Sequence, residues 1–214
     1  MDKKVEYLKS IDTGVVSDAM TLLGIEGWTS NIFPTSKEFK IAGRAFTMLY
    51  TPTVNGNEKT LATYETIDTC QPGDVLVITG ALEGRIFGGN LAFLSMNKGA
   101  EGVVLDGKTR DINEIEGRVP LFCRGAAIRP TDAQYKLIKA QVPVVLDGVP
   151  VSPGDIVVGD RDGIVVVPAS RVDDVIYQAE MIVEVEAEMG AALKRKAPGT
   201  ELYAILKKKK ILRK

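Results

Sequence analysis

The stretch GVVLDGKTRD, residues 102–111, decides the expected fold, because its pentapeptide VVLDG occurs twice in different settings. The first copy fills residues 103–107, and the second fills residues 144–148 and continues VPVSPGD. In the second copy, Asp147-Gly148 separates two β-branched runs, which predicts a hairpin turn. In the first copy, polar residues and a short helical segment come next, which predicts a turn at the carboxyl end of a strand, where open α/β sheets bind ligands.

Around the first copy, apolar runs of strand length alternate with segments of helical spacing. Strands are expected in PGDVLVITG, EGVVLDG and VPLFCRG, and helices between them in GGNLAFLSMNKG and RDINEIEG. This order predicts parallel strands joined by helical crossovers. Upstream, residues 12–24 and 57–70 have helical spacing, and residues 41–50 have strand character.

The second half of the chain has a different pattern. Residues 141–168 contain strand after strand, separated by Asp-Gly and Pro-Gly pairs, which predicts an antiparallel meander. A long helix is expected at about residues 170–194. The basic tail at residues 207–214 is expected to be a solvated end, with contact to acidic partners or RNA as the alternative. We expect residues 1–214 to form a single α/β domain.

The composition is that of an ordinary globular chain. Of the 214 residues, 45% are hydrophobic and 26% are charged, and the net charge of −1 gives the whole chain no basic footprint for nucleic acid. No secretory signal and no membrane-spanning apolar run is visible, and two cysteines make no disulfide framework. These features predict a cytoplasmic protein with no membrane or nucleic-acid partner.

The chain contains no histidine, which excludes several classes of active site. Ser-His and Cys-His nucleophile pairs cannot form, and neither can histidine-ligated zinc or iron sites. Polar chemistry must come from carboxylates, arginine, lysine, tyrosine and backbone amides, with or without a metal. A metal held by carboxylates and water would be a hard cation such as Mg²⁺ or Mn²⁺.

Two short motifs are candidates for a ligand site. Arg110-Asp111 comes after the first pentapeptide where a helix should begin, and a surface ion pair is the alternative interpretation. Gly88-Gly89 opens a predicted helix, where backbone amides favour an anion, and an ordinary turn is the alternative.

The sequence resembles the RraA-like family, which includes the class II 4-hydroxy-4-methyl-2-oxoglutarate aldolases and the regulator of ribonuclease E activity. The matching segments are, in order, DTGVVSDAM, IAGRAFTM, PGDVLVITG, FGGNLA, GAEGVVLDGKTRD, VPLFCRG and VSPGDIVVGDRDGIVVVP. They span about residues 11–168, and the long helix after them also fits. The resemblance implies a swivelling β/β/α domain, a ring-shaped homotrimer (or a hexamer) and an active site between neighbouring subunits.

The resemblance also implies roles for single residues. Asp111 would bind Mg²⁺ or Mn²⁺, directly or through water, and Arg110 would bind the keto or enolate oxygen of a 2-oxo acid substrate. Asp106 would brace the loop or orient metal-bound water, with a purely structural turn as the alternative. The substrate carboxylate would be held by the amides of Gly88, Gly89, Asn90 and Leu91. A glutamate of the neighbouring subunit's C-terminal helix would complete the site, and the candidates are Glu184, Glu186 and Glu188.

The implied activity is metal-dependent carbon–carbon cleavage. Retro-aldol cleavage of a 4-hydroxy-2-oxo acid, such as 4-hydroxy-4-methyl-2-oxoglutarate, leaves a pyruvate enolate, and so does decarboxylation of oxaloacetate. A metal ion and an arginine can stabilise this enolate without a histidine. No Schiff base is expected, because Lys108 is the one lysine within the motif and its side chain is expected to be solvated.

Gly89 departs from the pattern of the aldolases in this family, which carry an aspartate there that serves proton transfer. Family members with glycine at this position include the regulator of ribonuclease E activity. A non-catalytic regulator that acts by protein–protein binding is therefore the alternative to a lyase. Glu83 and Arg85 are candidates to compensate for the missing carboxylate.

Overall fold

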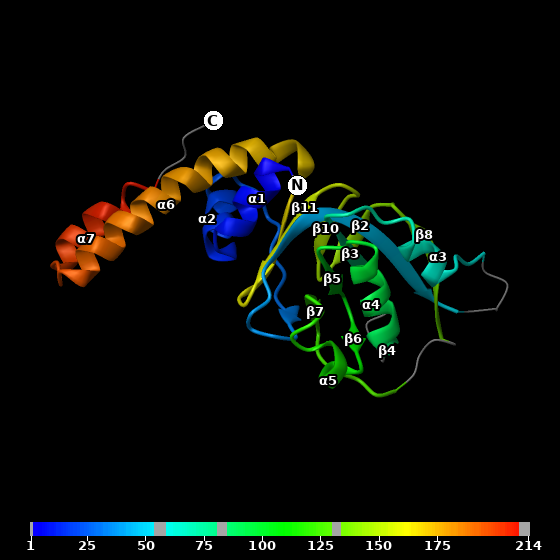
Figure 1. Ribbon diagram of the computed structural model, residues 1–214. Helices are drawn as coiled ribbons and strands as arrows, with labels where there is room; N and C mark the ends of the chain where they lie inside the picture. Colours follow the sequence, from blue (N-terminus) through cyan, green and yellow to red (C-terminus); the bar gives the residue numbers. More distant parts are fainter. Residues whose placement is uncertain (1, 54–58, 81–84, 130–133, 210–214) are drawn as a thin grey trace.

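The computed structural model describes residues 2–53, 59–80, 85–129 and 134–209. Its centre is an eight-stranded sheet in the order β1-β7-β5-β3-β2-β11-β12, with β8 also paired to β2 (Figure 1). The strands of this sheet are β1 (Phe33–Pro34), β2 (Ile41–Pro52), β3 (Asp74–Thr79), β5 (Gly102–Leu105), β7 (Leu121–Cys123), β8 (Tyr135–Ala140), β11 (Ile156–Asp160) and β12 (Gly163–Val167). The predicted α/β class is confirmed.

The predicted parallel strands form the middle of the sheet. β2, β3, β5 and β7 pair in parallel, and their connections carry α3 (Thr63–Ile67), α4 (Gly89–Asn97) and α5 (Ile112–Ile115). Of the helix predicted over residues 57–70, residues 57 and 58 lie outside the described residues, and among residues 59–70 the α-helix covers the five residues of α3. The chain before α3 is tied to β8 instead, where the Leu61 amide donates a 2.8 Å hydrogen bond to the Leu137 carbonyl.

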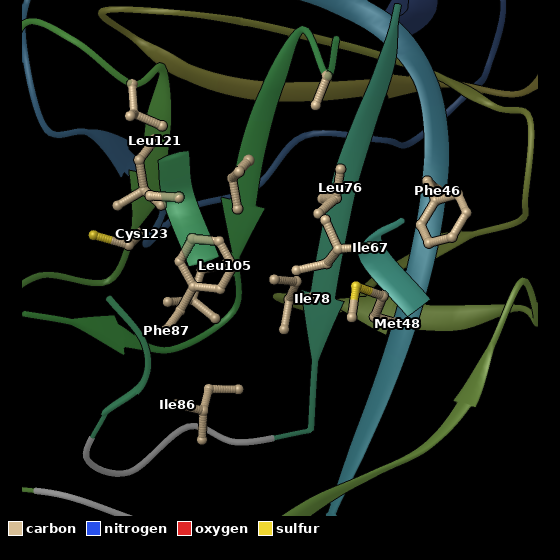
Figure 2. Close-up of a cluster of buried hydrophobic side chains, with 14 of the residues drawn as sticks. Phe46, Met48, Ile67, Leu76, Ile78, Ile86, Phe87, Leu105, Leu121 and Cys123 are labelled. Carbon is tan, nitrogen blue, oxygen red and sulfur yellow. The ribbon is translucent and has the colours of Figure 1, made fainter. Parts of the chain in front are cut away.

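Alternate residues of the parallel strands bury one face of the sheet against these crossover helices. Figure 2 shows this cluster, with Met48 on β2, Ile78 on β3 and Leu105 on β5. Two residues of β4 (Arg85–Phe87), Ile86 and Phe87, join it, and β4 pairs in parallel with β6 (Lys108–Thr109). Phe87 is 1% exposed, so the core fixes the residue directly before Gly88-Gly89.

The second half of the chain forms two separate hairpins, so the prediction of a continuous meander is wrong. β9 (Val144–Leu146) and β10 (Val149–Val151) form a two-stranded sheet of their own, and Asp147-Gly148 turns between them with φ values of 48° and 88°. β11 pairs with β12 and with β2, but not with β10. The first hairpin instead packs across the sheet, where its inward side chains join Val75 and Val104 in a buried cluster.

Helices cover the β11–β12 end of the molecule. α1 (Lys3–Ser10), α2 (Thr13–Leu22) and α6 (Val172–Lys194) pack on this end, and α6 then runs away from the sheet (Figure 1). The predicted long helix is thus confirmed. α7 (Gly199–Leu206) is not predicted from the sequence and folds back on α6. None of the helices in the described ranges is both long and apolar enough to cross a membrane.

Lys209 shows that the described part of the basic tail is not simply solvated. Its side chain is 18% exposed and lies 2.8 Å from Asp18 and 2.5 Å from Glu186. Burial alone would lower the pKa of Lys209, but its hydrogen bonds to the two carboxylates raise it. The prediction of a solvated end is wrong for this residue, because α7 returns the chain to α6.

Candidate active site

Thr109 is fully buried and fixes the segment that carries Arg110 and Asp111. Its amide donates to the Gly125 carbonyl at 3.0 Å, and its carbonyl accepts from the Ala127 amide at 2.8 Å. Its hydroxyl donates to the Phe87 carbonyl at 2.9 Å. Through Thr109, β6 is thus hydrogen-bonded both to the segment that follows β7 and to Phe87, which precedes α4.

Asp111 joins α5 to the first turn of α4. It is the N-cap of α5 with φ 63°, a left-handed conformation that costs most residues about 1–2 kcal/mol and that Asp tolerates better than most. Its Oδ2 accepts a 3.0 Å hydrogen bond from the Gly89 amide and lies 3.3 Å from Nε of Arg110. A Cβ on Gly88 would come within 2.8 Å of the same oxygen, so this contact favours glycine there. The fold thus brings together Arg110, Asp111 and the two glycines.

The N-terminus of α4 offers two amides to an anion. The Gly89 amide is already bound to Asp111, and the Ala92 amide donates to the Gly88 carbonyl at 3.0 Å. The amides of Asn90 and Leu91 have no hydrogen-bond partner within the described residues. Helix N-termini favour anions through such amides, so Asn90 and Leu91 are better placed than Gly89 among the predicted binding residues.

These groups line one side of a cavity of about 530 Å³. This side, called the anion wall, consists of Ile86, Gly88, Gly89, Asn90, Leu91, Arg110 and Asp111. The remaining lining residues, called the hydroxyl wall, are Tyr50, Thr60, Leu61, Thr63, Tyr64, Tyr135, Lys136 and Leu137. Sequence reasoning misses the hydroxyl wall, because its residues come from β2, β8, α3 and the segment before α3 and share no motif.

Asp106 lies outside this cavity. It is 6% exposed, its Oδ1 accepts from Nε of Arg124 at 2.6 Å, and its Oδ2 accepts from the Asp147 amide at 3.0 Å. Both carboxylate oxygens are therefore engaged inside the protein. These contacts support the loop-bracing interpretation of Asp106 and not a direct role at the reacting atoms.

Asp147 extends this buried network to the N-terminal region. Its carboxylate accepts from Arg124 at 2.5 Å and from the amides of Ser30 and Asn31 at 2.7 and 2.8 Å. Burial alone would raise the pKa of Asp147, but the hydrogen bonds from Asn31, Ser30 and Arg124 outweigh it and lower the pKa from 3.8 to about 2. Asp147 is thus an ionised structural residue.

Glu114 lies beside Gly89 at the edge of the site. A Cβ on Gly89 would come within 2.8 Å of Oε2 of Glu114, so the place of a side chain at position 89 is next to this carboxylate. Glu83, one of the two candidates to compensate for the missing aspartate, lies outside the described residues, and so does the side chain of Arg85.

The three candidate glutamates of α6 do not reach this chain's own cavity. In Figure 1, α6 extends away from the side of the sheet that carries α4 and α5, and it packs in a different hydrophobic cluster. Glu186 and Glu188 bind Lys209 and Lys208, each at 2.5 Å. The placement of Glu184, Glu186 or Glu188 in a neighbouring subunit's site stays a prediction.

Two lysines lie near the site in different ways. Lys108 is exposed, as predicted, and does not line the cavity. Lys136 on β8 does line it, and no sequence motif points to this residue. Any test for Schiff-base chemistry must therefore include Lys136.

A sequence model of the RraA-like family, described as Aldolase/RraA, matches residues 13–166, which is more than half of the chain. The chain belongs to the RraA-like family. The predicted RraA-like fold is confirmed by the crystal structure of RraAS2 from Streptomyces coelicolor, titled an unusual member of the RNase ES inhibitor RraA protein family. That structure has a TM-score of 0.75 and 28% identity, with 91% of this chain and 96% of RraAS2 covered.

Two curated relatives of this RraA-like chain differ in length. A Halalkalibacterium halodurans protein named "Putative 4-hydroxy-4-methyl-2-oxoglutarate aldolase" is 31% identical over 179 residues, with 82% of this chain and 81% of the relative covered. Protein DlpA of Legionella pneumophila is 29% identical over 198 residues, with 90% of this chain but 32% of DlpA covered. The chain therefore spans about a third of the length of DlpA.

Proposed function

We propose that this RraA-like protein is a carbon–carbon lyase that cleaves a 4-hydroxy-2-oxo acid to pyruvate. The observation that carries the proposal is the convergence of Arg110, Asp111 and the first turn of α4 on one cavity. The name of the Halalkalibacterium relative supports the substrate class. The substrates to test are 4-hydroxy-4-methyl-2-oxoglutarate and oxaloacetate.

The reaction breaks the bond between C3 and C4 of the substrate. The C4 hydroxyl loses its proton and becomes a carbonyl, the bonding electron pair passes to C3 to give the pyruvate enolate, and C3 then takes up a proton. In oxaloacetate the same bond breaks with release of CO₂. Arg110 would bind the charge that grows on the C2 oxygen, and the amides of Asn90 and Leu91 would hold the C1 carboxylate.

The residues present fit a hard divalent cation, Mg²⁺ or Mn²⁺. Oδ1 of Asp111 accepts no hydrogen bond from the part of the chain that the structure describes, and the missing Cβ of Gly88 leaves space beside this carboxylate. No cluster of three or more acidic or cysteine ligands occurs among the described residues. One carboxylate suits Mg²⁺, which keeps several waters. A cation held by Asp111 would supply positive charge beside the enolate oxygen.

The assembly belongs to the same proposal. We propose a homotrimer or hexamer in which a glutamate of a neighbouring subunit's α6 completes the site. The small-molecule partner is a 2-oxo acid, and no membrane or nucleic-acid partner is proposed.

A non-catalytic regulator is the second candidate, because position 89 is glycine and because RraAS2 is titled a member of an RNase inhibitor family. Proton NMR of pyruvate in D₂O, with purified protein and Mg²⁺ or Mn²⁺, distinguishes the two candidates. A lyase of this kind should exchange the methyl protons of pyruvate for deuterium through the enolate. Absence of exchange together with absence of oxaloacetate turnover would favour the regulator.

A further inference from the structure

The hydroxyl wall is dominated by side chains that carry a hydroxyl group. It contains Tyr50, Thr60, Thr63, Tyr64 and Tyr135, so three of the chain's six tyrosines line one cavity. The segments that carry them are far apart in the sequence. They meet because β8 pairs antiparallel with the second half of β2.

Two of these hydroxyls are held in place by the core. Tyr50 is 6% exposed, and its Oη lies 2.9 Å from Oγ1 of Thr63. Tyr50 is also the register partner of Leu137 on β8, and Leu137 is 2% exposed. The wall therefore presents a fixed pair of hydroxyls before a ligand arrives, which lowers the ordering cost of binding.

Among the described residues that form the hydroxyl wall, Lys136 is the one charged side chain. Tyrosine titrates near pH 10, and the threonine hydroxyl is uncharged, so these groups offer hydrogen bonds without charge at pH 7. Neither Tyr64 nor Tyr135 makes a side-chain hydrogen bond within the described residues. Lys136 is exposed and forms no ion pair with a carboxylate of those residues.

The two walls suit two different parts of a substrate. The anion wall, with Arg110 and free helix amides, suits the 2-oxo acid end. The hydroxyl wall suits an uncharged polyhydroxylated chain, because each hydroxyl of such a chain both donates and accepts hydrogen bonds. A second carboxylate would lose hydration water beside the uncharged hydroxyls, and of the described wall residues Lys136 alone could offset that cost by its charge.

We propose that the hydroxyl wall selects 2-oxo acids whose distal part is a polyhydroxylated, uncharged chain, in preference to 2-oxo dicarboxylates. Tyr64 and Tyr135 are the specificity-determining residues that contact the distal hydroxyls. The inference rests on the proposed lyase function for the 2-oxo acid end of the substrate.

The kinetic test uses two 4-hydroxy-2-oxo acids that share the reacting atoms. One is 2-oxo-3-deoxygluconate, which has a hydroxylated tail, and the other is 4-hydroxy-2-oxoglutarate, which ends in a carboxylate. We expect kcat/KM to be at least about tenfold higher for the first, and Tyr135→Phe to reduce this preference by about threefold to tenfold, the range of one neutral hydrogen bond. Tyr203→Phe on α7 is the matched control and should leave both values unchanged. A wild-type preference for the dicarboxylate that Lys136→Ala removes would overturn the proposal.

A binding test separates the wall from the reaction. Ligand-detected NMR should show that gluconate binds the wild-type protein more strongly than adipate, a dicarboxylate of the same length, and that a Tyr64→Phe/Tyr135→Phe variant weakens gluconate binding. If this pattern appears but neither 2-oxo acid is cleaved, the hydroxyl-wall proposal stands and the lyase proposal fails. Equal binding of the two probes, or gluconate binding that the double variant does not change, overturns the hydroxyl-wall proposal.

Discussion

The amide of Asp147 donates a 3.0 Å hydrogen bond to the carboxylate of Asp106, so the two copies of VVLDG meet in the folded chain. Arg124 donates to both carboxylates. The identical pentapeptides nevertheless have different backbones, because Asp147 has φ 48° in a hairpin turn and Asp106 has no positive φ. The segment after each copy determines the structure of its turn. The returning strand β10 follows the copy with Asp147, and β6 with Arg110-Asp111 follows the copy with Asp106.

Asp147→Asn is expected to reduce the acid sensitivity of the fold. Because the pKa of Asp147 is lowered from 3.8 to about 2, its ionised form stabilises the folded state above pH 3.8. This contribution, about 2 kcal/mol, is lost as the pH falls toward the folded-state pKa. The free energy of unfolding in urea should therefore fall less between pH 7 and pH 2.5 in Asp147→Asn than in the wild type. If the free energy of unfolding fell equally in the variant and the wild type, the ionised Asp147 could not be the source of this acid sensitivity.

Arg110 and Asp111 are each expected to be needed for activity, for different reasons. In the proposed mechanism, Arg110→Ala removes the cation that binds the enolate oxygen, so it should lower the rate by about 10²–10³, or about 3–4 kcal/mol. Arg110→Lys should restore little, because lysine lacks the planar fork. Asp111→Asn should weaken metal binding, so added Mg²⁺ or Mn²⁺ should partly restore its activity but not that of Arg110→Ala.

Oxaloacetate decarboxylation by these three variants, measured across a metal titration, checks both statements. If Arg110 and Asp111 were only a surface ion pair, all variants would keep the wild-type rate, and stability would change by about 0–1 kcal/mol.

Removal of metal is expected to abolish activity, and borohydride is not expected to trap pyruvate on the protein. The physical reason is that the proposed enolate is stabilised by positive charge and not by an imine. Activity after EDTA treatment and the intact mass after borohydride reduction measure the two outcomes. A mass increase that appears in the wild type but not in Lys136→Ala would instead show a Schiff base on the cavity lysine.

Gly88→Ala is expected to weaken Mn²⁺ binding about tenfold or more, the range for groups that orient a metal ligand. The new Cβ would lie 2.8 Å from Oδ2 of Asp111, which is tied to the Gly89 amide. Gly89→Ala should weaken binding less, because its Cβ would meet the flexible end of Glu114. Mn²⁺ titration followed by electron paramagnetic resonance compares the two variants, and equal affinities would contradict the proposed metal position.

Light scattering is expected to give the mass of three or six chains. The arm formed by α6 and α7 leaves large apolar side chains exposed, with Val183 at 37% and Leu193 at 56%. Contact with a neighbouring subunit would cover them, so Leu193→Glu should lower the assembled fraction. A stable wild-type monomer at micromolar concentration would contradict the proposed assembly.

Local patterns in the sequence predict most of the parallel core and the anion wall. The spacing of apolar residues predicts β3, α4 and α6, whereas the convergence of Gly88-Gly89 and Arg110-Asp111 on one site is implied by the family resemblance. These features depend on short-range periodicity and on the rule that carboxyl ends of parallel strands share one edge.

Long-range polar contacts could not be predicted in the same way. Lys209 contacts Asp18 across almost the whole chain, Arg124 links the two pentapeptides, and the tyrosines of the hydroxyl wall lie on separate elements. None of these residues stands in a recognisable pattern, because their partners are fixed only by tertiary packing. The break between the two predicted hairpins is also set by tertiary packing, because β11 pairs with β2 and not with β10.

β2 supplies side chains to three hydrophobic clusters at once. Ala42 packs with the terminal helices, Ile41 and Ala45 pack with the β9–β10 hairpin, and Phe46 and Met48 pack beneath the anion wall. Withdrawal of this one strand would open all three clusters together. These three clusters should therefore unfold in a single cooperative transition, and the amides in the middle of β2 should be among the last to exchange with solvent deuterium.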